Sequence, residues 1–204
     1  MRGSPRDRLG RGAQAVRGSE VFKVLLVGAA GLVVVTISFY AAPGIAGLAG
    51  AGLGMTTLAI AVIDARRLVI PDELSALALA LGLVDVVFER WPEMPAPMLQ
   101  ALIRASVTAA IFFAFRFAYR RLRGREGMGL GDVKLAGVAG VWLDWSSLPI
   151  AVEVAALGAL AFLAVQRLRT RRAPDPFAKL PFGAFFAPAI WMCWALERWR
   201  DWSP

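Results

Sequence analysis

The sequence contains no histidine and only one cysteine among its 204 residues. Without histidine there can be no Ser–His or Cys–His nucleophile–base pair and no zinc-binding HExxH helix. One cysteine excludes an intrachain disulfide framework and cysteine-based zinc sites. Because Cys193 lies within an apolar run, we expect its side chain to be a small buried hydrophobe. Any catalysis must therefore use acids, Arg, Lys, hydroxyl groups or backbone groups, and we expect no metal site.

Long polar stretches are also scarce. Hydrophobic residues make up 58% of the chain, and the mean hydropathy is +0.59. Apolar runs of roughly 20 residues have the length that crosses ~30 Å of hydrocarbon. We therefore predict an all-α polytopic membrane protein with about seven transmembrane helices. The predicted spans are residues 21–42, 44–63, 73–88, 98–119, 133–143, 150–165 and 182–196.

The polar remainder of the chain predicts its organisation. Residues 1–20 are rich in Arg and Gly and lack apolar periodicity, so we expect a disordered basic arm there. Residues 21–200 are expected to form a single transmembrane domain. With seven alternating spans, 19 of the 23 Lys and Arg residues fall on one side of the membrane. The positive-inside rule therefore predicts a cytoplasmic N-terminus. Since topology explains the net charge of +8, we expect no nucleic-acid partner.

Two further patterns predict features of the outer side. The seven tryptophans fall at or near the predicted outer ends of the spans, which suggests an interfacial aromatic belt. Asp85, Arg104 and Glu153 lie at similar predicted depths inside three spans. Charges within a bilayer usually pair with one another. We therefore predict a structural Asp85–Arg104–Glu153 cluster in the outer leaflet.

A glycine-rich segment, residues 127–134 (GMGLGDVK), stands where the chain enters the short fifth span. An acid at a membrane entrance is costly, so Asp132 is a functional candidate. From Asp132 to Trp145 the helix would measure only about 21 Å, which allows Asp132 to sit below the membrane surface. Irregular glycine backbone at that depth is tolerated beside protein or a water-filled cavity. We therefore expect a polar cavity open to the cytoplasm.

The predicted topology sends a second acid, Asp64, to the same face as Asp132. Asp64 follows the second span, and the intervening chain crosses the membrane and returns once. Two carboxyl groups in one cavity would share a proton. The ionised member can accept a proton from water as it attacks a carbonyl carbon, and the protonated member can polarise the carbonyl and protonate the leaving amine. This hypothesis requires the two carboxyl groups to lie within hydrogen-bond or one-water reach.

Three segments together resemble a known family. They are Asp64 with Ile70-Pro71-Asp72, the motif Gly-Leu-Gly-Asp132-Val-Lys134-Leu135 with the glycines before it, and Leu180-Pro181-Phe182-Gly183. This set is similar to the type IV prepilin peptidases, which are polytopic aspartyl proteases of the GxGD class. The resemblance covers roughly residues 44–196.

The resemblance implies a function and a set of site residues. Asp64 and Asp132 would be the catalytic dyad, and Gly129, Gly131 and Lys134 would support the motif. The family cleaves the basic leader of prepilins and pseudopilins, which serve type IV pili and type II secretion, at the cytoplasmic face of the bacterial inner membrane. Because longer members carry CxxC motifs and also N-methylate their product, this short sequence without CxxC is expected to lack methyltransferase activity. No cofactor, including S-adenosylmethionine, is then expected.

Other interpretations remain open at the level of sequence. The chain could be a non-enzymatic transporter or assembly scaffold, since transporters also bury acids beside broken helices. A presenilin-like protease is a third option, although Leu180–Gly183 stands where that group has Pro-Ala-Leu. Asp132 could be a helix N-cap, and we predict that Asp72, which follows Pro71, is the N-cap of the third span. Asp64 could pair with Arg66 or Arg67, and Lys134 could be solvated, tune the dyad or hold lipid phosphate.

Overall fold

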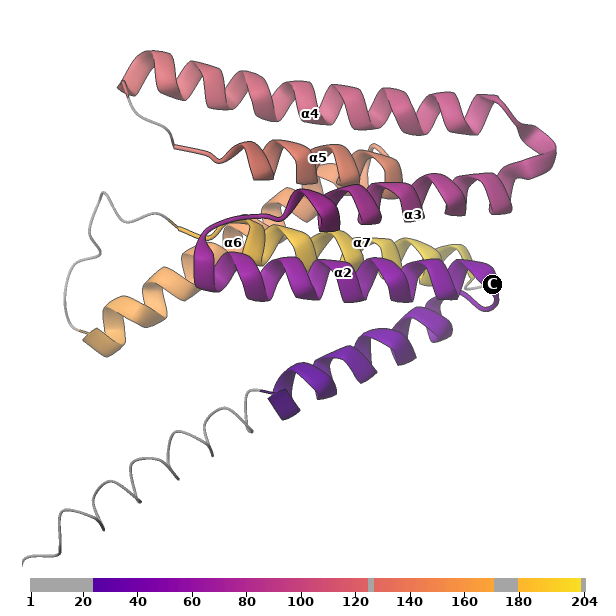
Figure 1. Ribbon diagram of the computed structural model, residues 1–204, viewed down its shortest axis with the longest axis horizontal. Helices are drawn as coiled ribbons and strands as arrows, with labels where there is room; N and C mark the ends of the chain where they lie inside the picture. The colour runs from indigo at the N-terminus through magenta and orange to yellow at the C-terminus, as the bar shows by residue number, and fades with distance from the viewer. Residues whose placement is uncertain (1–23, 125–126, 171–179, 203–204) are drawn as a thin grey trace, which may run out of the picture.

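The structure is a computed structural model that describes residues 24–124, 127–170 and 180–202. Over these ranges the chain forms seven α-helices and one short 3₁₀ helix, with no strand. The predicted basic arm, residues 1–20, lies outside the described residues. In chain order, the helices are the N-terminal helix Val24–Ala41, α2 (Ile45–Arg67), α3 (Asp72–Arg90), η1 (Trp91–Glu93), α4 (Ala96–Arg123), α5 (Leu130–Trp142), α6 (Ser147–Thr170) and α7 (Gly183–Trp202) (Figure 1).

The all-α membrane fold is confirmed. Four helices are long and apolar enough to cross a membrane, namely Val24–Ala41, α2, α4 and α6. The other three are shorter or carry more charge. A total of seven transmembrane helices therefore stays a prediction, although each predicted span coincides with one observed helix.

Most helices run beyond the apolar segments that predicted them. α2 continues through Asp64 to Arg67, and α4 extends to Arg123. Apolar character ends at the edge of the membrane, but helical geometry does not, because Arg is a good helix former. Its long side chain can also extend from the helix towards water. Asp64 is consequently a helical residue rather than the first residue of a loop.

The short helix α5 is the most enclosed element. Residues 135–142 are all buried, so the helix presents no exposed face over this length. It packs against α3, α4 and α7. A Cβ on Gly140 would lie 2.5 Å from both the Cα and the N of Ala105, so only glycine permits the observed approach of α5 to α4. Close backbone contact at small residues is typical of membrane helix pairs.

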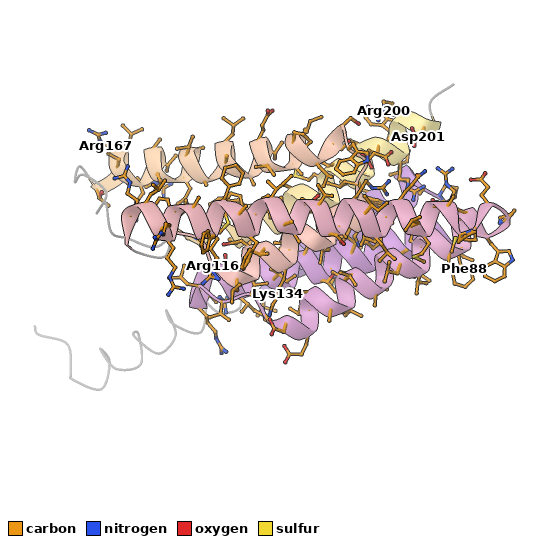
Figure 2. The ribbon with its side chains drawn as sticks, turned by 90° about the horizontal axis from the view of Figure 1, so that it is seen from above. Phe88, Arg116, Lys134, Arg167, Arg200 and Asp201 are labelled. Atoms are coloured by element: carbon orange, nitrogen blue, oxygen red, sulfur yellow. The ribbon has the colours of Figure 1, made fainter. Side chains whose placement is uncertain are left out.

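The two ends of the helix bundle differ in the residues that they carry. The C-terminal end of α2 and the N-terminal ends of α5 and α7 lie together at one end (Figure 1). We call this the Asp64 end. Arg116 and Arg167 lie towards this end, whereas Phe88, Arg200 and Asp201 lie at the opposite end (Figure 2). This separation agrees with the charge asymmetry in the sequence.

The predicted tryptophan belt is wrong for three of its members. Trp142, Trp191 and Trp194 are buried, and the indole N–H of Trp142 donates to the carbonyl of Ala78 at 2.8 Å. Trp194 packs so closely over Gly50 that a Cβ there would lie 1.7 Å from the ring. Position along a span gives the depth of a side chain but not the face of the helix that carries it. These indoles therefore contribute to helix packing.

Candidate functional site

Asp64 lies in the last turn of α2 and is only 5% exposed. The backbone N–H of Ala184 donates to its Oδ2 at 2.9 Å, and the amide of Gly183 also faces this carboxyl group. Gly183 and Ala184 are the first two residues of α7. The N-terminus of a helix offers unpaired N–H groups and a positive dipole end, both of which favour a carboxylate. The first turn of α7 therefore holds Asp64 in place.

Asp132 is the third residue of α5 and is 9% exposed. Its Oδ2 accepts a hydrogen bond of 3.1 Å from the backbone N–H of Gly129, which is the N-cap residue. A side chain at this helix position that binds back to the N-cap amide forms half of a capping box. Asp132 is thus part of the helix cap but not the N-cap itself. The glycine-rich segment turns this acid inwards at the Asp64 end.

The two acids are both buried, and the residues beside them share a neighbour. They come from helices that begin or end at the same end of the bundle (Figure 1). Ile70 lies in the short connection between α2 and α3. Its side chain packs near both Asp64 and Asp132. It contacts Gly131, next to Asp132, and Gly183, next to the amide that binds Asp64. Three segments that are distant in sequence therefore meet around the two carboxyl groups.

Lys134 forms an ion pair with Asp72, with 2.6 Å between Nζ and Oδ1. This contact joins α5, just beyond Asp132, to the first turn of α3. The prediction that Asp72 is an N-cap is wrong by one residue, because α3 begins at Asp72 and its N-cap is Pro71. Both side chains are substantially exposed, at 47% for Lys134 and 71% for Asp72. The pair therefore lies at the rim of the site.

Sequence reasoning missed the role of the α7 N-terminus. In the sequence, Leu180–Gly183 contributes only to the family resemblance, whereas in the structure Gly183 and the following Ala184 supply backbone amides to Asp64. The available signal was a glycine directly before an apolar helical run, which allows a helix N-terminus to approach another group closely. Which group it approaches depends on the packing of α7 against α2.

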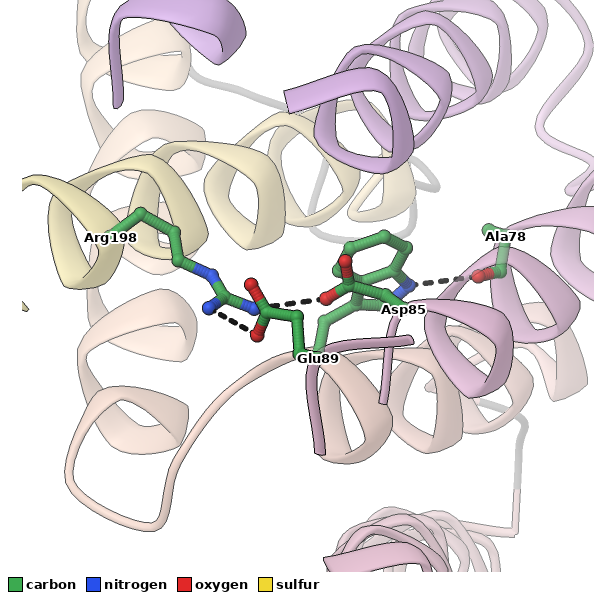
Figure 3. Close-up of polar contacts among 5 residues, drawn as sticks. Ala78, Asp85, Glu89 and Arg198 are labelled. Carbon is green, nitrogen blue, oxygen red and sulfur yellow. Dashed lines mark hydrogen bonds and ion pairs between the residues drawn. The ribbon is translucent and has the colours of Figure 1, made fainter. Parts of the chain in front are cut away.

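The predicted Asp85–Arg104–Glu153 cluster is wrong. Asp85 pairs instead with Arg198 at 2.9 Å, and the same guanidinium binds Glu89 at 2.5 Å (Figure 3). Glu153 is exposed. Similar depth does not place side chains on facing helix surfaces. In addition, α7 extends past the predicted end of its span and so brings Arg198 to Asp85.

Arg104 has different partners from those predicted. Its Nε donates to the carbonyl of Gly140 at 3.2 Å, and its Nη1 lies 3.5 Å from Oδ1 of Asp144. Arg104 and Asp85 nevertheless line one polar cavity of about 280 Å³ together with Arg198 and Glu197. This cavity is at the end opposite to Asp64 and is not the expected catalytic cavity. Among the residues that the structure describes, no group of three or more acidic or cysteine side chains could hold a metal ion.

Comparison with known families identifies the chain. Residues 51–165, which include both Asp64 and Asp132, match the model of the type IV leader peptidase family. The chain belongs to this family. The predicted resemblance to this family is thereby confirmed. The match begins within α2 and ends within α6, so it covers the segments around Asp64 and Asp132.

Curated relatives agree with membership of the leader peptidase family. The prepilin leader peptidase/N-methyltransferase of Aeromonas salmonicida is 31% identical over 194 residues, which cover 93% of this chain and 64% of that protein. The protein of the same name from Pseudomonas aeruginosa is 33% identical over 147 residues, covering 71% and 48%. That from Burkholderia pseudomallei is 35% identical over 146 residues, covering 71% and 45%. The chain thus spans less than two thirds of the length of these relatives. No solved structure shows significant similarity to it.

Proposed function

We propose that this chain is a membrane-embedded aspartyl endopeptidase that cleaves the basic leader of prepilin-like or pseudopilin-like proteins. Asp64 and Asp132 are its catalytic pair. The observation that carries the proposal is the presence of two buried acids at one end of the helix bundle, with Ile70 packed beside both and both within the leader peptidase match. The names of the relatives give two activities, leader peptidase and N-methyltransferase. The proposal concerns only the peptidase activity.

The chemistry follows from a carboxyl pair that shares one proton. The ionised carboxylate takes a proton from water while the water oxygen bonds to the carbonyl carbon of the scissile peptide. The protonated carboxyl group donates to the developing oxyanion. The C–N bond then breaks: the leaving amine receives the proton taken from water, and a hydroxyl proton returns to the other carboxylate as the carbonyl re-forms. Burial supports this scheme, because electrostatic interactions are stronger where water is excluded.

Charge distribution supports a location for the reaction. Of the basic residues that the positive-inside rule assigns to the cytoplasm, the described residues Arg66, Arg67, Arg116 and Arg167 lie towards the Asp64 end (Figure 2). We therefore propose that cleavage occurs at the cytoplasmic face of the bacterial inner membrane. There the substrate's leader would reach the acids while its apolar helix lies in the bilayer beside the enzyme. The assembly served would be a type IV pilus or a type II secretion system.

Family membership and the names of the relatives favour a peptidase over the transporter or scaffold alternative. The two acids also lie at one end of the bundle, whereas transporter sites usually lie near the bilayer midplane. The presenilin-like alternative would use the same acids on another substrate class. Comparing cleavage of a prepilin-like substrate with cleavage of a transmembrane helix that lacks a basic leader distinguishes these two proteases.

The test uses isosteric variants of the full chain in detergent or membranes. The variants Asp64→Asn and Asp132→Asn keep a side-chain oxygen that can accept the backbone hydrogen bonds. Their amide groups cannot ionise. Each is expected to reduce cleavage of a prepilin-like substrate by roughly 10²–10⁴-fold. Glu153→Gln is the matched control, because Glu153 is an exposed acid on α6 and its variant should retain activity. Retention of full activity by either aspartate variant would refute the catalytic assignment.

A further inference from the structure

Ile70 packs against residues beside both acids although it carries no reactive group. It lies two residues before the start of α3 and is 8% exposed. Its side chain contacts the backbone of two glycines, one on each side. Gly131 immediately precedes Asp132, and Gly183 immediately precedes Ala184, whose amide binds Asp64. A single apolar side chain therefore touches the supports of both acids.

The fit around Ile70 leaves no room for an additional carbon atom. A Cβ on Gly131 would lie 2.8 Å from Cβ of Ile70. A Cβ on Gly183 would lie 2.6 Å from Cδ1 of Ile70 and 3.0 Å from Oδ2 of Asp64. The two glycines thus allow the starts of α5 and α7 to close directly onto Ile70. Close-packed contacts of this kind transmit small displacements, because protein interiors have low compressibility.

We propose that Ile70 is a positioning residue that sets the separation between Asp64 and Asp132. The proposal rests on the proposed function for its link to catalysis. Ile70 acts as a spacer: it holds the α5 start against one of its faces and the α7 start against another. Removing its branches lets these segments shift towards each other. Since a shift of about 1 Å at a catalytic group can cost 10²-fold in rate, Ile70 controls activity without touching the reacting atoms.

The first test separates positioning from substrate binding. Ile70→Ala is expected to lower kcat by about 10–100-fold with little change in KM, because the dyad geometry changes but the substrate surface does not. Ile70→Val, which keeps both γ positions, should retain most of the rate. Ile190→Ala is the matched control, since Ile190 is fully buried in α7 two turns from Gly183. It should lower thermal stability while kcat of the folded protein stays unchanged.

The second test replaces each of the two glycines that contact Ile70, alone and in combination with Ile70→Val, and measures activity. Gly183→Ala and Gly131→Ala should each reduce activity, whereas Gly137→Ala should not, because its Cβ would meet nothing closer than 3.8 Å. Ile70→Val removes Cδ1, the atom nearest the new methyl at residue 183. It should therefore partly restore Gly183→Ala. It should not restore Gly131→Ala, because the Cβ of residue 70 remains. Identical behaviour of the two double variants would overturn the proposed packing.

A third measurement does not depend on catalysis. In a Cys193→Ala background, Asp64→Cys and Asp132→Cys are combined, and the yield of a short bifunctional cross-link reports their separation. Ile70→Ala should change this yield relative to Ile70→Val and Ile190→Ala. If no prepilin-like substrate is cleaved yet cross-linking depends on Ile70, the proposed function fails and the spacer role stands. If cleavage occurs but neither kcat nor cross-linking responds to Ile70→Ala, the spacer role is refuted.

Discussion

Lys134 and Asp72 form an ion pair that joins two helices beside the site but contributes little to the stability of the fold. Their contact joins α5 to α3 at the rim of the site, two residues beyond Asp132. Exposed ion pairs contribute little to stability, because water screens the charges and two long side chains lose freedom. The predicted role of Lys134 as a support of the GxGD motif stays a prediction. The structure shows that the ion-pair partner of Lys134 is Asp72, which the sequence did not indicate.

We expect Lys134→Ala to lower the free energy of unfolding by less than about 1 kcal/mol, because both side chains are solvent-accessible. The charge-reversed variant Lys134→Asp with Asp72→Lys should recover most of that loss. A double-mutant cycle measured by denaturation in detergent gives the coupling between the two side chains. A coupling energy above about 2 kcal/mol would contradict the view that this is a weak rim contact.

At the scale of elements, α3 and α7 are joined at the end opposite to Asp64 by Arg198. This side chain binds Asp85 and Glu89 together (Figure 3). Asp85 is 4% exposed, so its charge depends on the guanidinium. A buried ion pair adds little net stability, but removing one partner leaves an uncompensated charge in a low-dielectric environment. Arg198 is therefore required for a stable link between α3 and α7, because it compensates the buried charge of Asp85.

Arg198→Ala is expected to destabilise the protein by about 3–5 kcal/mol, measured as thermal or chemical unfolding in detergent. Asp85→Asn in the same chain should restore a large part of this loss, because it removes the unpaired charge. Arg200→Ala is the matched control: it also removes an arginine from the last turns of α7, but its side chain is exposed. If Asp85→Asn fails to improve the Arg198→Ala variant, unpaired charge is not the cause of the loss.

For the whole molecule, the distribution of charge between the two ends predicts how it sits in the membrane. Arg116 and Arg167 lie towards the Asp64 end (Figure 2). The polar cavity lined by Asp85 and Glu197 lies at the other end. Lys and Arg are retained on the cytoplasmic side during insertion. The same orientation would give the proposed dyad access from the cytoplasm, where a basic leader would be presented.

Labelling of single cysteines tests this orientation. In a Cys193→Ala background, Ser146→Cys places a thiol in the exposed connection between α5 and α6, and Arg123→Cys places one at the exposed end of α4. In intact spheroplasts, a membrane-impermeant maleimide should label residue 146 at once. Residue 123 should react only after permeabilisation. The reverse pattern would place the Asp64 end outside, and the Cys193→Ala parent should stay unlabelled throughout.

Several properties follow from the sequence alone because they depend on composition and on local order. The number and approximate position of the helices follow from apolar runs, and the absence of His limits the available chemistry. Asp64 and Asp132 become a candidate pair because counting spans sends both to one face. The glycines before Asp132 indicate close approach without naming the neighbour. These inferences need only the length, polarity and conformational freedom of successive residues.

Only the tertiary structure decided which side chains face one another. Depth in the membrane was predictable for Asp85, Arg104 and Glu153, but their pairing was not, because helix rotation and packing set it. The amide of Ala184 reaches Asp64 across 120 residues of chain. Ile70 meets Gly131 and Gly183 only because α7 packs against both α2 and α5. Such contacts depend on the fit between helix surfaces, which no local pattern of residues contains.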